Sequence, residues 1–243
     1  MDWHSRFLQQ AGWTRDLRAY LFAQTRLADA ARVLEVGCGT GALLADLPTR
    51  ARVHGLDLDA ARLDEAKVYA PDAFLACGDA LSLPYPTAAF DITFCHFLLL
   101  WVRDPLAALL EMKRVTRPGG SVLALAEPDY TRRVDKPDAL AALGRWQTAS
   151  LRLQGADPGL GARLADMFRQ AGITLLETGP LLGGGTRPLL PREREQEWAV
   201  LEADLAGIAP AQEILRLKQV EASAWERGER VLHVPTFFAW GQA

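Results

Sequence analysis

Hydrophobic positions recur along the first half of the chain in short runs that are typical of buried strands. These runs predict strands over residues 32–36, 52–58, 73–77, 90–95 and 121–127. The segments between them predict helices over residues 41–47, 60–70 and 105–115. Because apolar strands that alternate with helices of this length form βαβ units, the pattern predicts a doubly wound α/β fold with a mostly parallel sheet.

The two ends of the chain depart from this alternation. Residues 3–27 have apolar positions at helical spacing, which predict one or two amphipathic helices with a break at Gly12. After residue 127, we expect helices over residues 137–154, 161–171, 192–205 and 210–227, and strands over residues 173–182 and 231–240. Gly183, Gly184 and Gly185 predict a flexible break. Since the helices at 137–154 and 192–227 are extra to a doubly wound sheet, we expect them to cap its mouth.

Composition and charge narrow the class of protein. The chain has 243 residues, of which 49% are hydrophobic and 23% charged, so it suits one large globular domain and is neither disordered nor fibrous. A net charge of −3 and a pI near 5.8 give no overall basic surface for nucleic acid. No apolar run approaches the roughly 18 residues of a membrane helix, and charges interrupt the first residues. A cytoplasmic protein without signal peptide or membrane partner is expected.

Two smaller patterns concern cysteines and charged runs. Cys38, Cys77 and Cys95 form no C-x-x-C pair, which predicts neither a disulfide framework nor a metal site. Each lies next to the end of a predicted strand, and we expect each to be a small buried residue. Residues 192–197 mix arginine and glutamate, which predicts a solvated helix face with pairs of opposite sign.

The most informative motif is the stretch VLEVGCGTG at residues 33–41. It leads from a buried strand through Gly37, Gly39 and Gly41 into a predicted helix. Glycines allow a sharp turn and let a ligand approach the backbone, and a helix N-terminus offers free N–H groups to an anion. The G-x-G-x-G spacing is tighter than the G-x-G-x-x-G fingerprint of dinucleotide-binding proteins.

Carboxylates follow the next two strands at the same edge of the predicted sheet. Asp57 comes twenty residues after Gly37, where a carboxylate can accept both hydroxyls of a ribose. Asp79 follows the third strand and can accept a hydrogen bond from an adenine amino group. Leu58 and Leu81 are placed to sandwich the base. Together the strand ends predict a nucleoside-binding site.

In combination, these motifs resemble the class I S-adenosylmethionine-dependent methyltransferases, and among them the small-molecule, type 11-like group. The resemblance rests on residues 35–41, Asp57, residues 78–80, residues 90–94 and residues 117–120, and covers residues 30–127. It implies S-adenosylmethionine as cofactor and S-adenosylhomocysteine as product. It also implies a Rossmann-like sheet of seven strands, whose last strand, at 231–240, inserts antiparallel beside the fifth.

The resemblance also implies a division of labour along a single domain, residues 1–243. Residues 1–29 would form a helical lid, 30–127 the cofactor-binding core, 128–172 and 183–230 the cap, and 231–240 the closing strand. Trp13, Arg18 and Tyr20 are candidates to fold over the cofactor. The implied cofactor-binding residues are Glu35, Gly37, Cys38, Gly39, Gly41, Asp57, Leu58, Gly78, Asp79, Ala80, Cys95 and His96.

Candidates for the acceptor side lie after the fourth and fifth strands. His96 is a candidate general base, with a pocket-lining role or simple packing as the alternatives. A base is needed only if the acceptor must lose a proton, because positioning and water exclusion supply much of the rate of methyl transfer. The candidate acceptor pocket consists of Trp13, Trp101, Glu127, Asp129 and Tyr130; loop capping is the alternative for the last three.

The leading hypothesis is therefore methyl transfer to a small molecule. A nucleic-acid or protein methyltransferase is the alternative, although residues 95–97 lack the Asn/Asp-Pro-Pro-Tyr/Phe signature of amino-directed base methyltransferases. A nicotinamide-dependent oxidoreductase and a non-catalytic cofactor-binding subunit are further alternatives, both disfavoured by the motifs. The sequence names no acceptor and leaves a homo-oligomer open.

Overall fold

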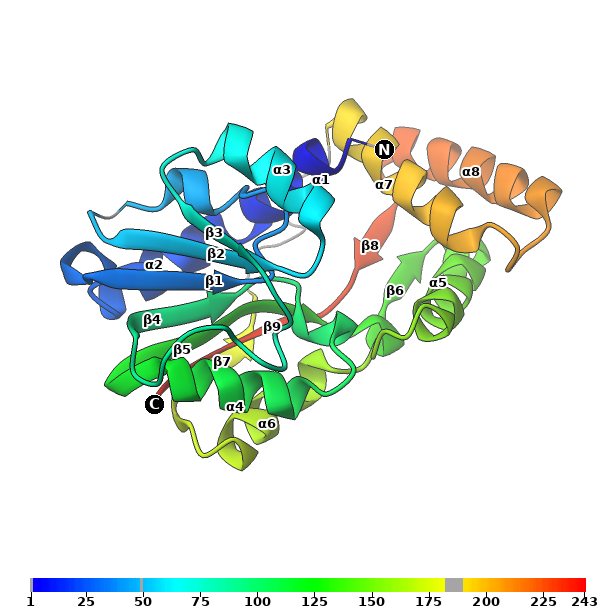
Figure 1. The fold of residues 1–243 in the computed structure, drawn as a ribbon. Coiled ribbons are helices and arrows are strands. Elements are labelled where there is room, and N and C mark those ends of the chain that lie inside the picture. Colours follow the sequence, from blue (N-terminus) through cyan, green and yellow to red (C-terminus); the bar gives the residue numbers. More distant parts are fainter. Residues whose placement is uncertain (1, 49, 182–189) are drawn as a thin grey trace.

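A seven-stranded sheet forms the centre of the computed structural model, which describes residues 2–48, 50–181 and 190–243. The strand order is β3-β2-β1-β4-β5-β9-β7 (Figure 1). The strands are β1 (Arg32–Val36), β2 (Arg52–Asp57), β3 (Phe74–Cys77), β4 (Phe90–Cys95), β5 (Thr116–Pro128), β7 (Thr174–Pro180) and β9 (Thr236–Gln242). β9 runs antiparallel between β5 and β7, and the pairs among β1 to β5 are parallel. The predicted fold class is confirmed.

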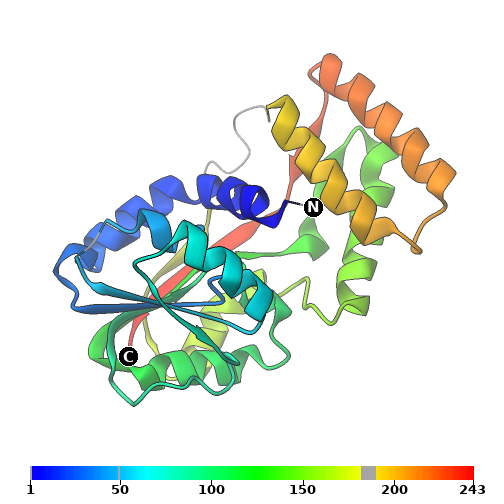
Figure 2. The ribbon, with the colours of Figure 1, turned by 45° about the horizontal axis from the view of Figure 1, so that its top comes forward.

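Helices cover both faces of this sheet because its central strands are apolar on both sides. Leu34 and Val36 of β1 pack in one cluster with α4 (Pro105–Val115) and α6 (Leu164–Gln170), whereas Val33 packs in another with α2 (Arg15–Gln24). α1 (Trp3–Trp13) and α3 (Ala60–Tyr69) lie on the α2 side, so the ribbon has three layers (Figures 1 and 2). α6 falls within the predicted cap at 128–172, but it packs on the sheet beside α4.

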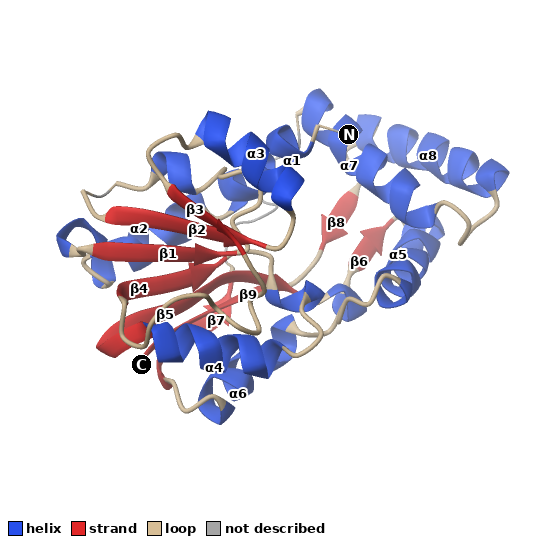
Figure 3. Ribbon diagram, in the orientation of Figure 1, coloured by secondary structure: helices blue, strands red, loops and turns tan. Residues whose placement is uncertain are grey.

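A separate helical unit lies beyond the carboxyl ends of the parallel strands (Figure 3). It consists of α5 (Ala141–Leu153), α7 (Pro191–Leu205), α8 (Ala211–Glu226) and a two-stranded sheet of β6 (Val134–Lys136) and β8 (Val231–His233). Its own hydrophobic core contains Leu140, Leu143, Trp198, Leu201, Leu205, Ile214 and Leu217. We call this unit the cap. The predicted flexible break at 183–185 lies outside the described residues.

Three predicted boundaries are wrong. Residues 41–47 form only the 3₁₀ turn Leu44–Asp46, because Gly41 has a left-handed φ of 77° and Pro48 prevents continuation, which leaves too few residues for a stable α-helix. The break between α1 and α2 falls at Thr14, and Gly12 lies inside α1.

The predicted strand at 231–240 is two strands, β8 and β9. Pro235 lies between them and has no N–H to donate to a ladder, while its carbonyl accepts a bond from the Asp129 N–H at 2.7 Å. β8 therefore pairs with β6 in the cap, and only β9 closes the central sheet.

Candidate active site

The glycine loop, residues 37–41, follows β1 at the carboxyl edge of the parallel strands. Gly37, Gly39 and Gly41 all have left-handed φ angles, of 75°, 52° and 77°. A Cβ at Gly37 would lie 2.6 Å from Leu98 Cδ1, and one at Gly39 would lie 2.8 Å from Phe7 Cε2. The loop N–H groups of Gly37 and Cys38 both donate to the Leu56 carbonyl, at 2.7 and 3.0 Å. The backbone therefore needs glycine here, both for its conformation and for space.

Asp57 ties this loop to the end of β2. Its Oδ2 accepts from the Gly39 N–H at 2.7 Å, and its Oδ1 accepts from the Asp59 N–H at 2.9 Å. A carboxylate has about four lone-pair positions, so the bonds made by the described residues leave two acceptor positions for ligand donors. Asp57 thus stands between the glycine loop and β3, as the sequence predicts.

The segment after β3 lies next to Asp57. Asp57 is paired with Cys77 in the parallel ladder, and the Gly78 N–H donates to the Asp57 carbonyl at 3.0 Å. Asp79 Oδ1 accepts from the Leu81 N–H at 2.9 Å, which holds the turn that contains Ala80. Leu58 is 72% exposed, so an apolar side chain is open at this edge to contact a planar ring.

Glu35 is the most unusual group of the edge. Its residue is 2% exposed, and its Oε2 is buried with no hydrogen-bond partner in the part of the chain that the structure describes. Burial raises the pKa of Glu35 well above its ordinary value; the charge of Arg18 from α2 lowers this pKa, and that of Asp57 raises it. Burial likewise lowers the pKa of Arg18, and the Glu35 charge opposes that shift. Glu35 and Arg18 are therefore near enough for the charge of each to act on the pKa of the other.

His96, directly after β4, is a poor general base in this structure. Burial, followed by the charge of Arg18, lowers the pKa of His96 to about 3, so the ring is neutral at pH 7 and its protonated form is strongly disfavoured. His96 Nε2 lies 3.0 Å from Thr14 Oγ1. The Thr14 hydroxyl also lies 3.3 Å from the Ala11 carbonyl, and the tautomer of the His96 ring sets which partner of the Thr14–His96 bond donates.

Two of the predicted acceptor residues, Glu127 and Asp129, accept hydrogen bonds from nearby loops. Glu127 is completely buried, and its two oxygens accept from the N–H groups of Leu98, Leu99 and Leu100 at 3.1, 2.9 and 3.1 Å. Burial raises the pKa of Glu127 to about 7, although these three bonds oppose the shift.

Asp129 is 1% exposed and accepts from the Thr131 N–H at 3.0 Å, which makes it the cap of the following turn. Trp101 is 48% exposed and lies in the 3₁₀ turn Leu99–Trp101. For Glu127 and Asp129 these hydrogen bonds support the capping alternative.

Trp13 and Tyr130, two further predicted acceptor residues, have Arg6 as a common neighbour. The guanidinium carbon of Arg6 lies 5.0 Å from the Trp13 ring centre, and Phe97 meets that ring edge-on at 6.1 Å. Burial raises the pKa of Tyr130, and the charges of Arg6 and Glu197 are the next influences on it. Arg6 therefore lies close to both aromatic residues.

Helix α1 lies between the glycine loop and α7 and contacts both (Figure 2). On one side, His4 Nδ1 lies 2.8 Å from Thr40 Oγ1. On the other side, Arg6 forms an ion pair with Glu197 of α7, in which the Arg6 side chain is 8% exposed. The prediction of a solvated face at 192–197 is therefore wrong for two of its residues: Glu197 pairs with α1, and Arg194 donates to Glu221 of α8 at 3.0 Å. Arg192 and Glu195 are exposed, as predicted.

The cysteine prediction is confirmed at two positions and wrong at one. Cys38 and Cys95 are 4% and 0% exposed, and burial raises the pKa of both thiols. Cys77 is exposed because it ends β3, which is an edge strand. The described residues contain no group of three or more His, Cys, Asp or Glu side chains that could hold a metal ion.

Comparison with known proteins points to one chemistry. Residues 34–124 match the family described as a methyltransferase domain. The malonyl-[acyl-carrier protein] O-methyltransferase of Halorhodospira halophila is 32% identical in an alignment that covers 86% of this chain and 74% of that protein. The demethylmenaquinone methyltransferase of Halalkalibacterium halodurans is 30% identical in an alignment that covers 73% of this chain and 80% of that protein.

The fold itself is shared more widely. The solved structure of the [4+2]-cyclase SpnF matches with a TM-score of 0.62 at 23% identity, and covers 93% of this chain and 80% of that chain. At this identity the likeness shows the fold alone, since one fold supports many reactions. None of the helices in the described ranges has the length and apolar character of a membrane span.

Proposed function

This chain belongs to the class I S-adenosylmethionine-dependent methyltransferases, and we propose that it binds S-adenosylmethionine at the carboxyl edge of β1, β2 and β3 and methylates a small molecule under the cap. The observation that carries the placement is the buried Oε2 of Glu35, which has no partner among the described residues. Buried carboxylate oxygens are almost always hydrogen-bonded, and the ammonium group of the cofactor would supply the donor.

The other residues of the edge fit the remaining parts of the cofactor. Arg18, which faces Glu35, would bind the carboxylate of the same amino-acid moiety. Asp57 would accept the ribose hydroxyls at its free lone pairs, and Asp79 with the Ala80 N–H would read the adenine. The exposed Leu58 side chain would cover one face of that base. Glycines at 37, 39 and 41 would line the methionine portion.

The protein's own contribution to methyl transfer is positioning and exclusion of water. The bound cofactor supplies a methyl group already activated on a sulfonium, so little acid–base chemistry is required. Neutral His96 would form a wall next to the methyl group. Helix α1, with Phe7 over Gly39, would act as the lid that closes the site.

The comparisons support the reaction class more strongly than any one acceptor. The two relatives are named for different acceptors, a malonyl-[acyl-carrier protein] and demethylmenaquinone. We therefore propose a small-molecule acceptor without naming it, and a cytoplasmic location remains a prediction.

A thermal-shift comparison tests the proposal. S-adenosylhomocysteine, S-adenosylmethionine and NAD would each be added at about 100 times the expected Kd, where a bound ligand adds about 2.7 kcal/mol to stability. We expect the two sulfur nucleosides to raise the melting temperature and NAD to leave it unchanged. A shift with NAD alone, or with none of the three, would contradict the proposal.

A further inference from the structure

The cap contains a pocket that the cofactor edge does not use. It has a volume of about 310 Å³ and lies between α5 and residues 130–135. Its lining consists of Tyr130, Thr131, Arg133, Asp135, Ala141, Gly144, Arg145, Thr148 and Arg152. Three arginines against one aspartate make the lining strongly basic.

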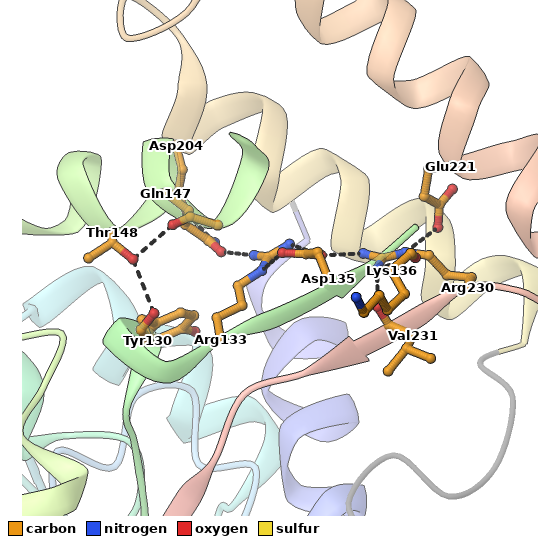
Figure 4. A network of polar contacts seen from close by, with 11 residues as sticks. Tyr130, Arg133, Asp135, Lys136, Gln147, Thr148, Asp204, Glu221, Arg230 and Val231 are labelled. Carbon is orange, nitrogen blue, oxygen red and sulfur yellow. Dashed lines mark hydrogen bonds and ion pairs between the residues drawn. The ribbon is translucent and has the colours of Figure 1, made fainter. Parts of the chain in front are cut away.

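Arg133 and Asp135 form a rigid, neutralised part of this lining (Figure 4). Arg133 donates from Nε and Nη2 to the Asp135 carboxylate at 2.7 and 3.0 Å, and the two side chains are 5% and 1% exposed. Arg230 donates to the same carboxylate at 2.8 Å. A Cβ at Gly144 would lie 3.0 Å from Asp135 Oδ2, so the backbone of α5 packs directly on the pair.

Arg145 and Arg152, in contrast, are exposed and uncompensated. Within residues 2–48, 50–181 and 190–243, neither side chain has an ion-pair or hydrogen-bond partner. They are seven residues apart on α5, so they project from one helix face about 10.5 Å apart along the axis. The nearby acids are engaged elsewhere: Asp135 is paired twice, and Asp204 accepts from Gln147 and Gln154 at 2.8 and 3.3 Å.

One lining residue connects the pocket with the candidate active site. Tyr130 lies two residues after β5, whose carboxyl end is at the cofactor edge. The charges of Arg6 and Glu197, from the contact between α1 and α7, act on the same phenol. A volume near 310 Å³ is at the lower end of ligand pockets and suits one part of a molecule.

We propose that this pocket binds an anionic group of the methyl acceptor, a carboxylate or a phosphate, through Arg145 and Arg152. The planar guanidinium matches both anions with paired N–H donors, and two unpaired arginines on one face supply charge without an internal competitor. The inference rests on the proposed function, since it places the acceptor between the cap and the cofactor edge. It predicts that the acceptor is an acid or a phosphate ester.

Titration calorimetry with small anions tests the inference. Succinate and phenyl phosphate, at constant ionic strength, would be titrated into the wild type, into R145Q/R152Q and into the control R50Q/R52Q. The control removes the same charge from exposed arginines at the start of β2, at the opposite edge of the sheet. S-adenosylhomocysteine would be titrated into all three proteins.

We expect one of the two anions to bind the wild type and the control equally, and R145Q/R152Q at least tenfold more weakly. The anion that binds decides between carboxylate and phosphate. The inference is overturned if neither anion binds the wild type, or if R145Q/R152Q binds as the wild type does. S-adenosylhomocysteine should bind all three proteins within threefold; its failure to bind the wild type would contradict the proposed function and leave the anion result standing by itself.

Discussion

The cofactor edge and the cap hold their carboxylates in different ways. At the edge, Asp57 is held by backbone N–H groups of Gly39 and Asp59, within 18 residues of the chain. In the cap, Asp135 is held by the side chains of Arg133 and Arg230, the second 95 residues away. Backbone donors follow from the fold, whereas side-chain partners depend on the identity of each residue.

This difference separates a binding surface from a scaffold. Asp57 keeps free lone pairs and has the exposed Leu58 next to it, so a ligand can add to the site. The Asp135 carboxylate accepts three charged hydrogen bonds and is almost fully buried, so it has little left to offer. We infer that the edge supplies cofactor affinity and that the Asp135 network supplies the shape of the cap.

The largest expected effect comes from breaking that network. Asp135→Ala should reduce the free energy of unfolding by about 3–5 kcal/mol, because it removes the carboxylate that two buried arginines share. Urea denaturation measures the change. Asp138→Ala is the control, since its exposed pair with Lys136 should contribute less than about 1 kcal/mol. Equal midpoints for the two variants would contradict a scaffold role for Asp135.

A pH series tests whether burial controls the pKa of Glu127, which lies near the end of β5 at the edge of the sheet. Its folded pKa of about 7 lies above the ordinary 4.5, so the folded protein binds a proton more readily than the unfolded chain. The stabilisation from this group is fully present below about pH 4.5 and is lost as the pH rises through 7. Between those values the loss amounts to at most about 3 kcal/mol.

Glu127→Gln removes the titrating group and should flatten this dependence. Urea unfolding at pH 5 and pH 7 would compare the two proteins. The wild type should lose more stability than Glu127→Gln on going to pH 7. Parallel changes in both proteins would show that Glu127 does not titrate in this range.

The glycine loop should matter for binding more than for stability. Gly37→Ala should weaken S-adenosylhomocysteine binding at least tenfold, because the new Cβ is strained at a φ of 75° and displaces Leu98. Gly228→Ala is the matched control, since its φ is 69° and its Cβ would meet nothing within 4 Å. Equal affinity for S-adenosylhomocysteine in Gly37→Ala and Gly228→Ala would contradict a role of the glycine loop in binding.

The smallest effect is expected where the two regions meet. Glu197→Gln removes the ion pair with Arg6 that holds α1 against α7, and should raise the dissociation rate of S-adenosylhomocysteine about threefold. Stopped-flow fluorescence would measure this rate. Glu195→Gln, an exposed position on the same helix, should leave it unchanged. Identical rates in the wild type and Glu197→Gln would argue against a lid role for α1.

The same contrast explains what could be predicted from the sequence. The edge was predictable because buried strands, glycines and Asp57 are close in the chain and follow the geometry of a parallel sheet. The position of β9 came from the resemblance and is confirmed, but its separation from β8 at Pro235 was missed. The helix at 41–47 was predicted from apolar spacing, which does not register the left-handed φ of Gly41.

The cap contacts could not be predicted in the same way. Arg6 and Glu197 are 191 residues apart, and no spacing along the chain signals such a pair. Glu127 and Asp129 lie at the edge as predicted, but only the structure shows that nearby backbone N–H groups use their oxygens. For the same reason Arg145 and Arg152 gave no signal, since their importance depends on which acids the fold places elsewhere.

The central claim is that the carboxyl edge of the sheet binds the cofactor through Asp57. Titration calorimetry of S-adenosylhomocysteine into Asp57→Ala and into Asp59→Ala tests it most directly, because Asp59 is a neighbouring carboxylate that caps α3 and pairs with Arg62 of the same helix. Asp57→Ala should bind at least tenfold more weakly than the wild type, a loss of about 1.4 kcal/mol, while Asp59→Ala should bind within threefold. Unchanged affinity in a folded Asp57→Ala protein would contradict the account.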